Sequence, residues 1–364
     1  MKLGILGLPN VGKTTLFNAI TNAGAETTKY PFSTIEYNAG TAAVPDRRLD
    51  FLAGLYSPKK YTPAVIEFAD IAGLVKGAYE GGGLGNKFLS HIRVTDAVIH
   101  VVRCFDDENI IHVAGGADPA RDIETVDFEL IMADVELLER RSDKAKKAAK
   151  GDKKYMREAE ALDRLLNHMN DGKSARSYEC DEEDRKIIST CELLSGKPVI
   201  YIANLDEKSF AAGYESDPYY LAVKGLADIE KALVLPVCAK AEQEIAQLGA
   251  EDRVLFSEEL GISESGLDGV IRCSYSLLGL ISFLTAGPDE VRAWTVKRGT
   301  KAPQAAGKIH SDMERGFIRA ETVAFEDLEA CGSMAAARDK GLIRSEGKDY
   351  IVRDGDVLLI RFNV

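Results

Sequence analysis

The apolar residues fall into short continuous runs that alternate with stretches of helical spacing. The first run, residues 2–6, ends at Gly7 and precedes residues 14–23, in which apolar positions share one helical face. Uninterrupted apolar runs are typical of strands buried on both faces, so the pattern predicts an α/β fold with a mostly parallel sheet covered by helices. The four later runs of this kind are residues 65–69, 97–102, 198–202 and 232–237.

Two stretches rich in charge and alanine interrupt this alternation between residues 128 and 169. Apolar residues recur there every three or four positions on both sides of Gly151, which predicts two antiparallel helices joined by a turn. We expect this hairpin to form an arm inserted into the α/β domain. Its expected apolar contacts are Ile131, Val135 and Leu138 with Met156, Ala159, Leu162 and Leu166.

A third unit follows Gly266. It has a strand-like run at residues 291–296 and two apolar runs, 350–352 and 357–360, on either side of Asp354-Gly355-Asp356. An Asp-Gly pair between apolar runs predicts a hairpin, so we expect a small α+β domain with Trp294 in its core. The predicted organisation is an α/β domain in two parts (1–127 and 176–275), the hairpin (128–175) and the C-terminal domain (276–364).

Composition narrows the functional classes. Acidic residues (58) exceed basic residues (46), and the formal net charge of -12 argues against bulk electrostatic binding to DNA. No run approaches the roughly 20 apolar residues that span a bilayer, so we expect no membrane contact. The six cysteines form no C-x-x-C pair, which indicates reduced thiols in a cytosolic protein.

The strongest chemical signal is Gly7-Leu-Pro-Asn-Val-Gly12-Lys13-Thr14, which matches G-x-x-x-x-G-K-[ST] between a strand and a helix. In such a loop, backbone N–H groups at a helix N-terminus bind phosphates, and Lys13 adds a positive charge beside the β- and γ-phosphates. The Thr14 hydroxyl would ligate Mg²⁺. The motif predicts a nucleoside triphosphate site.

Further residues fit around the same phosphates. Asp70 ends the run 65–69 and is placed to support the Mg²⁺ shell, while Gly73 offers a backbone N–H to the γ-phosphate. Thr34, in the candidate switch segment 30–35, would add a second hydroxyl to Mg²⁺. Leu74 stands where a water-orienting glutamine is expected. Hydrolysis must therefore use another group, or be slow until a partner binds.

The base-reading element is Asn204-Leu205-Asp206-Glu207, directly after a predicted strand. A guanine site normally reads N-K-x-D, whereas Leu205 and Glu207 occupy the lysine and aspartate positions here. The longer carboxylate arm does not reproduce the guanine geometry, so ATP is favoured over GTP; Asp206 keeps a GTP-specific site open as the alternative. Cys238-Ala239-Lys240 occupies the place of a base-supporting loop.

The predicted arm carries a positive local charge, opposite in sign to the net charge of the chain. Residues 140–157 carry nine basic and two acidic side chains, a local charge of +7. Basic helical tips contact phosphate backbones without sequence preference, so RNA is the expected partner. A solvated helical hairpin with no nucleic-acid role is the alternative.

Taken together, these motifs make the chain resemble the YchF/Obg-like ATPase family over nearly its whole length. The resemblance implies a P-loop NTPase G domain, an inserted coiled-coil arm and a C-terminal TGS domain of β-grasp type. It also implies a preference for ATP, and association with the ribosome, its large subunit or ribosomal RNA through the arm and TGS domain. The motifs that carry it are residues 7–15, 31–36, 70–78, 83–86, 109–113, 291–295, 302–310 and 362–364.

The resemblance further implies residue roles. His112 would replace the missing glutamine as a catalytic group beside Lys13, although its apolar neighbours also fit a half-buried structural histidine. Asn10 resembles an asparagine that coordinates K⁺ in related NTPases. Thr14, Thr34 and Asp70 would hold Mg²⁺. The implied nucleotide-binding residues are Asn10, Val11, Gly12, Lys13, Thr14, Thr15, Gly73, Asn204, Leu205, Glu207, Cys238 and Ala239.

The function favoured at this point is an ATP-hydrolysing switch of low intrinsic rate that acts on the ribosome, in translation or stress regulation. Two alternatives from other classes stay open: a small-molecule P-loop kinase and a ribosome-binding scaffold without hydrolysis. One departure from the family pattern is Tyr37, which stands where proline is usual.

Overall fold

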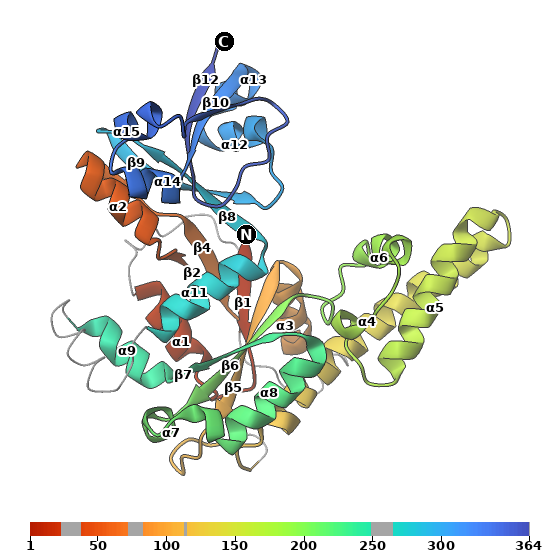
Figure 1. Cartoon of the computed structure of the whole chain (residues 1–364). Coiled ribbons are helices and arrows are strands. Elements are labelled where there is room, and N and C mark those ends of the chain that lie inside the picture. The colour runs from red at the N-terminus through yellow and green to blue at the C-terminus, as the bar shows by residue number, and fades with distance from the viewer. Residues whose placement is uncertain (23–37, 72–82, 113–114, 249–264, 364) are drawn as a thin grey trace. The chain divides into compact units, whose positions relative to one another are not determined.

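The computed structural model describes residues 1–22, 38–71, 83–112, 115–248 and 265–363 (Figure 1). The chain divides into two compact units. The first contains residues 1–41 and 67–270, and the second contains residues 42–66 and 271–364. None of the described helices is long and apolar enough to cross a membrane.

A six-stranded sheet organises the first unit, in the order β2-β4-β1-β5-β6-β7. The pairs β1–β4, β1–β5, β5–β6 and β6–β7 are all parallel, which confirms the predicted α/β fold. Every residue of β5 and β6 is buried, as expected for central strands covered on both faces. The strands are β1 (Lys2–Leu6), β2 (Asn38–Ala43), β4 (Val65–Asp70), β5 (Ala97–Cys104), β6 (Val199–Leu205) and β7 (Leu233–Val237).

Helices pack on this sheet and on one another. The helix α1 that follows the glycine loop packs against α9, and α8 packs on β5, β6 and β7. Asp217 begins α8 by accepting hydrogen bonds from two backbone N–H groups, with Pro218 in the first helical position. The helices are α1 (Lys13–Asn22), α3 (Gly83–Arg93), α7 (Glu207–Ala211), α8 (Pro218–Glu230) and α9 (Ala239–Gln247), with the 3₁₀ turn η4 (Tyr214–Ser216). The helix α11 (Gly266–Leu277) begins in this unit and ends in the second.

The predicted helical hairpin is confirmed as α4 (Pro119–Ala149) and α5 (Met156–Asn170), joined at Gly151 through the 3₁₀ turn η2 (Lys153–Tyr155). The first helix begins nine residues before Phe128, because Asp118 caps it and Pro119 occupies its first turn. The helix α4 packs on β5 and α8 as well as on α5, so one continuous helix belongs to both the α/β domain and the arm.

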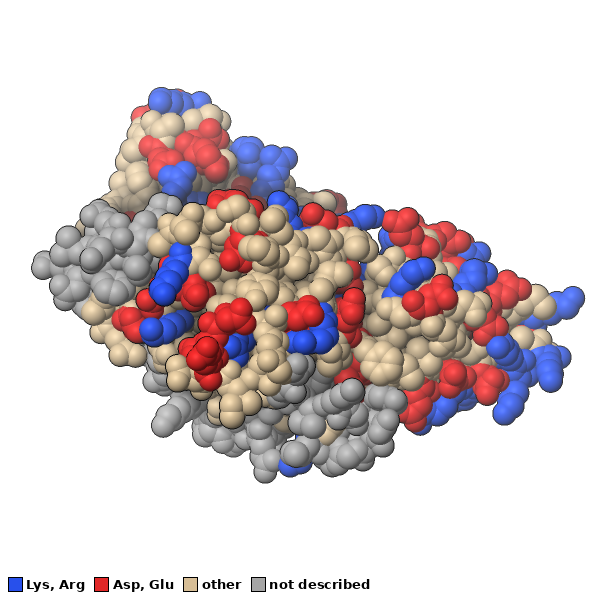
Figure 2. All heavy atoms as spheres, turned by 90° about the horizontal axis from the view of Figure 1, so that it is seen from below, with Lys and Arg blue, Asp and Glu red and all other residues tan. Residues whose placement is uncertain are grey.

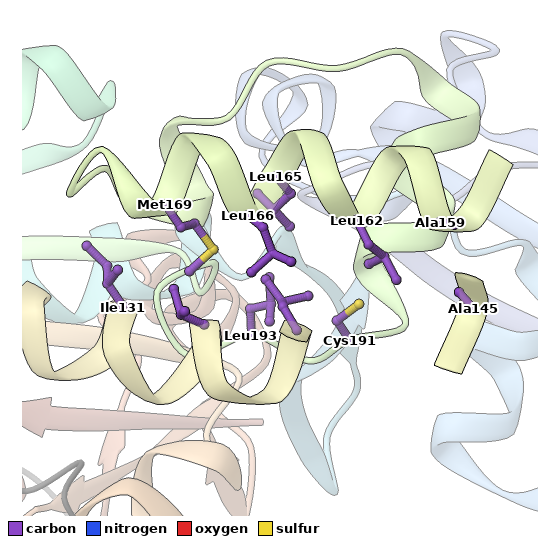
Figure 3. Close-up of a cluster of buried hydrophobic side chains, with 11 residues drawn as sticks. Ile131, Ala145, Ala159, Leu162, Leu165, Leu166, Met169, Cys191 and Leu193 are labelled. Atoms are coloured by element: carbon purple, nitrogen blue, oxygen red, sulfur yellow. The ribbon is translucent and has the colours of Figure 1, made fainter. Parts of the chain in front are cut away.

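The arm has its own apolar core (Figure 3). Met156 is an exception to the prediction, since it is 49% exposed at the start of α5. After α5, the 3₁₀ turn η3 (Ala175–Ser177) and α6 (Glu182–Ser189) complete the insertion. The core consists of Ile131, Val135, Leu138, Ala145, Ala159, Leu162, Leu165, Leu166, Met169, Cys191 and Leu193.

The second unit contains another six-stranded sheet, in the order β11-β10-β12-β8-β9-β3. Its core lies between the strands and α12. Trp294, predicted to lie in the core, is only partly buried and packs against it, while its indole N–H donates to Thr285 Oγ1. The strands are β3 (Lys60–Thr62), β8 (Leu280–Ala286), β9 (Glu290–Lys297), β10 (Phe317–Ala324), β11 (Arg344–Glu346) and β12 (Asp356–Phe362). The helices are α2 (Arg47–Tyr56), α12 (Ala302–Ile309), α13 (Ser311–Arg315), α14 (Phe325–Cys331) and α15 (Met334–Asp339).

The hairpin predicted around Gly355 is wrong. β12 pairs antiparallel with β10 and parallel with β8, and Ile351 makes only an isolated bridge to Lys301. The Asp-Gly pair still turns the chain, with Gly355 at φ 83. However, the Asp354 carboxylate accepts from Ser282 N–H, and the Gly355 N–H donates to Ser282 O. The turn is therefore held by β8 and not by a hairpin partner.

Residues 42–66, which the sequence pattern assigned to the α/β domain, pack with the C-terminal segment. β3 pairs in parallel with β9, and the rings of Phe51 and Phe325 meet edge to face at 5.6 Å. Arg48 donates to Asp354 at 2.8 Å. Contacts between residues so far apart in sequence leave no local pattern by which they could be predicted.

Candidate nucleotide-binding site

The glycine loop joins β1 to α1 with a backbone that only glycine adopts easily. Gly7 and Gly12 have φ values of 149 and 97. A Cβ atom on Gly7 would lie 2.4 Å from the Val101 carbonyl oxygen, and one on Gly12 would lie 2.4 Å from Asn204 Nδ2. Both motif glycines are thus required by close approach of neighbouring groups as well as by backbone conformation.

Lys13, in the first turn of α1, folds back over the loop. Its Nζ donates to the Leu8 carbonyl at 2.6 Å, and the residue is only 7% exposed. Burial lowers the pKa of Lys13 to about 8, although the nearby Asp70 carboxylate opposes this shift. The ammonium group is therefore poorly compensated by its own surroundings and favours an added anion.

Thr14 and Asp70, predicted from separate motifs, meet in the structure. Thr14 Oγ1 donates to Asp70 Oδ2 at 2.9 Å. Mg²⁺ bound with a nucleotide takes most of its ligands from phosphate and water and only one or two from protein oxygens, which this pair fits. Among the residues that the structure describes, no group of three or more His, Cys, Asp or Glu is arranged to hold a metal by itself. The predicted Thr34 and Gly73 lie outside the described residues.

Asn204, at the end of β6, joins the glycine loop to the loop before α9. Its Nδ2 donates to the Val11 carbonyl at 2.9 Å, and its Oδ1 accepts from the Ala239 N–H at 3.0 Å. The side chain is buried, so both bonds form in a low-dielectric setting. Three segments far apart in sequence are thereby held in one arrangement.

A cavity of about 520 Å³ opens beside this junction, within the size range of small-molecule sites. It brings together the predicted Asn10, Gly12, Thr15, Asn204, Leu205, Glu207, Cys238 and Ala239. One wall comes from the segment after β5. It consists of residues 105–107, which lie outside every motif and were missed by sequence analysis, and of Ile110 from the motif 109–113. The further lining residues are Phe105, Asp106, Asp107, Ile110, Asp206, Lys208, Lys240 and Gln243.

The two acids of the base-reading segment already have partners within the protein. Asp206 accepts from the Ser209 N–H at 2.7 Å as the cap of α7. Glu207 pairs with Lys240, with 3.1 Å between Glu207 Oε1 and Lys240 Nζ. Neither carboxylate stands alone at the cavity wall as a guanine reader would.

His112 lies against an acid in the first turn of α4. Its Nε2 is 2.8 Å from Asp122 Oδ2, and both side chains are 3% exposed. Arg121 contacts the other oxygen of the same carboxylate at 3.0 Å. The preceding residue, Ile111, accepts through its carbonyl from Asn10 Nδ2 at 3.1 Å, which ties this segment to the glycine loop.

Many of the basic side chains of the arm form ion pairs, so fewer are available to bind phosphate than their number suggested. Five of the nine pair with acids, most of which lie outside residues 140–157. Figure 2 shows basic side chains gathered at the far end of the arm. Within residues 115–248, all of which the structure describes, the exposed basic side chains of 140–157 without an ion pair are Lys144, Lys147, Lys150 and Lys153.

A parallel sheet whose first strand leads through a phosphate loop into a helix, with an asparagine bridge to the last loop, defines a P-loop NTPase of the G-domain type. Two family profiles match the chain. One, described as "50S ribosome-binding GTPase", covers residues 2–132, and the YchF-GTPase C-terminal profile, described as "Protein of unknown function (DUF933)", covers residues 280–363.

Full-length relatives narrow the class further. The chain is 56% identical to the ribosome-binding ATPase YchF of Bacillus subtilis, over 99% of each chain. It is 42% identical to Obg-like ATPase 1 of Gallus gallus, over all of this chain and 92% of that one. The structure of the Schizosaccharomyces pombe YchF GTPase superposes with a TM-score of 0.88 at 36% identity, over 99% of this chain and 97% of that one. The chain belongs to the YchF/Obg-like ATPase family.

Proposed function

We propose that the chain is a ribosome-associated ATPase that acts as a nucleotide-dependent switch. The observation that carries the proposal is the Asn204 bridge, which joins a complete phosphate loop to a cavity of nucleoside size. Relatives that match over the full length are named ribosome-binding ATPases. The physiological setting that we infer is translation or its regulation under stress, in the cytoplasm.

Phosphate binding in this proposal exchanges one partner of Lys13 for another. The Nζ leaves the Leu8 carbonyl for the β- and γ-phosphates, where its charge is fully compensated. The Thr14 hydroxyl and the Asp70 carboxylate hold the Mg²⁺ that accompanies the nucleotide, with Thr34 and Gly73 completing the site. Mg²⁺ neutralises charge that develops on the phosphates. The Asn10 side-chain oxygen is the atom that would coordinate K⁺.

The preference for adenine over guanine follows from the partners that Asp206 and Glu207 already have. Because Asp206 caps α7 and Glu207 pairs with Lys240, neither acid of the base-reading segment is free to accept from the N1 and N2 protons of a guanine. We expect ATP to bind at least ~10-fold more tightly than GTP, about 1.4 kcal/mol. Titration of the purified protein with each nucleotide, in the presence of Mg²⁺, measures the ratio. GTP binding tenfold tighter than ATP would overturn the assignment of the base.

Hydrolysis in this proposal depends on His112. Replacement of His112 with alanine is expected to lower the single-turnover rate of phosphate release by about 10²-fold, the usual share of a positioned acid–base group. The affinity for ATP should change by less than about twofold, since the ring is not proposed to bind the nucleotide. Rapid-quench measurement of inorganic phosphate separates the two effects.

Asp122→Asn provides the matched control for this experiment. It keeps the buried contact to His112 Nε2 but removes the charge that orients the imidazole, so an intermediate rate is expected. If His112→Ala hydrolyses ATP at the wild-type rate, the pair with Asp122 is a structural contact only, and another group must position the attacking water.

The arm is the first of two proposed contacts with ribosomal RNA. Its four lysines without ion pairs belong to the last turns of α4 and to the turn between α4 and α5. Lysines of this kind bind phosphate as exposed point charges and carry no sequence preference. The paired arginines, by contrast, have their charge largely compensated within the arm.

The second proposed RNA contact lies on the sheet of the C-terminal unit. Arg319 of β10 and Arg361 of β12 are directly opposite each other, an arrangement that is unfavourable for like charges. Both reach Glu321, at 3.7 and 3.0 Å, and Arg338 reaches the same carboxylate at 3.6 Å. One acid therefore offsets three arginines, and the surplus positive charge fits a phosphate backbone.

A further inference from the structure

The geometry points to Arg103 as a positioning residue for the base side of the nucleotide pocket. Arg103 lies near the end of β5, in register with Asn204 of β6, and is 2% exposed. It does not line the cavity itself. The inference deepens the proposed function and rests on it in one respect, namely that the cavity accepts the nucleoside part of ATP.

The Arg103 guanidinium is bonded to three backbone carbonyls of a single loop. Nε donates to Phe105 O at 3.0 Å, Nη1 to Ile110 O at 3.0 Å and Nη2 to Asp107 O at 3.2 Å. The guanidinium carbon also lies 4.7 Å from the centre of the Phe105 ring. Five donors fixed in one plane and spread over three nitrogens let an arginine reach three carbonyls along a loop, whereas the donors of a lysine all sit on one nitrogen.

This charge is buried without an acid. In the part of the chain that the structure describes, no carboxylate pairs with Arg103, so only carbonyl dipoles and one aromatic ring compensate it. Burying a charge in this way is costly. A neutral residue would avoid that cost, so the arginine is best explained by the loop conformation that its three bonds impose.

This loop forms the cavity wall that follows β5, and residues 105–107 of the wall lie outside every sequence motif. Phe105, Asp107 and Ile110, whose carbonyls Arg103 binds, all line the cavity. The next residue, Ile111, accepts from Asn10 of the phosphate loop. Arg103 thus acts through residues 105–111, which reach from the base side of the pocket to the phosphate loop.

The experiment compares wild type with Arg103→Met and Arg103→Lys, using ATP and inorganic tripolyphosphate as separate probes. We expect Arg103→Met to weaken ATP binding by at least ~10-fold. Without the three hydrogen bonds from Arg103, residues 105–111 are less ordered in the free protein, and binding must then pay the entropy of ordering them. Tripolyphosphate, which has no base, should bind within about twofold of wild type. Arg103→Lys keeps the positive charge but not the planar set of guanidinium donors, so most of the loss in ATP affinity should persist.

Two further measurements make the result independent of general stability and of the proposed function. Arg176→Lys changes another buried arginine outside the cavity lining, and should lower the melting temperature without selective loss of ATP over tripolyphosphate. Hydrogen exchange of residues 105–111, without nucleotide, should accelerate in Arg103→Met. Unchanged exchange there, or equal loss of both ligands, overturns the role of Arg103. A wild type that binds no ATP, with accelerated exchange in Arg103→Met, overturns the proposed function alone.

Discussion

Replacing Lys13 with alanine is expected to lower ATP hydrolysis by about 10²- to 10³-fold, the usual cost of removing one charge that stabilises a transferring phosphoryl group. Affinity for ATP should fall as well, because the only buried ammonium of the phosphate loop is lost. Calorimetric titration and a phosphate-release assay measure the two effects. A ribosome-binding scaffold with vestigial nucleotide binding would release no phosphate even as wild type, so only the fall in hydrolysis distinguishes it.

The fold should survive this change. Lys197→Ala is the matched control, since Lys197 is a part-buried lysine that donates to the carbonyls of Arg93 and Thr95. It should lose some stability and keep its ATPase activity. If Lys13→Ala retains hydrolysis within about threefold of wild type, the phosphate loop is not the catalytic site.

The pH dependence of Lys13 offers a second readout of the same variant. The pKa of Lys13 is lowered in the folded protein to about 8, below its ordinary value of 10.5, so folding releases a proton between these pH values. Without nucleotide, wild-type stability relative to Lys13→Ala should therefore rise as pH increases from 8 to 10.5. Bound phosphate restores the charge, so ATP affinity should fall as pH rises above about 8. Thermal melts and titrations across this range test both signs.

The sequence pattern predicted correctly the elements whose conformation is set by neighbouring residues in the chain. The run at residues 2–6, the glycine loop and Lys13 occupy consecutive positions, and the structure places them as strand, loop and helix start. The meeting of Thr14 and Asp70 also followed, because neighbouring parallel strands end at the same edge of a sheet.

Features that depend on distant partners were not predictable in this way. The Asp354-Gly355 pair specifies a turn, but the partner that holds it is Ser282 of β8. The wall of the cavity at Phe105 carries no motif, because its shape comes from one arginine that binds backbone carbonyls, which are the same in every residue. Sequence patterns report side-chain chemistry and spacing, whereas the partners of Asp354 and Arg103 are backbone groups that no pattern marks.

The charge of the arm also depends on distant partners that a count of residues does not reveal. Counting residues 140–157 gave +7, yet Arg140, Lys146 and Arg157 pair with Glu136, Asp163 and Asp181, all outside that window. Free positive charge is concentrated in the four lysines at the tip. The effective patch is thus smaller and more localised than the count implied, which makes it accessible to a simple experiment.

Replacing Lys144, Lys147, Lys150 and Lys153 together with alanine is expected to weaken ribosome binding by about 10²-fold at low salt. Each lysine that binds a phosphate releases a counterion, so the slope of log K against log salt should decrease in size by about 3. Exposed lysines without ion pairs contribute little to folding, and the free protein should keep its melting temperature and ATPase rate. Sedimentation with purified ribosomes over a salt series measures the slope.

A second quadruple variant distinguishes the location of charge from its amount. Alanine at Lys173, Lys186, Lys224 and Lys231 changes the net charge equally but leaves the arm tip intact. If net charge governs association, both variants weaken binding and reduce the slope to the same extent. If the tip makes direct phosphate contacts, only the first variant does. Full binding by the first variant would instead mean that the arm is a solvated hairpin, leaving the arginines around Glu321 as the remaining proposed contact with RNA.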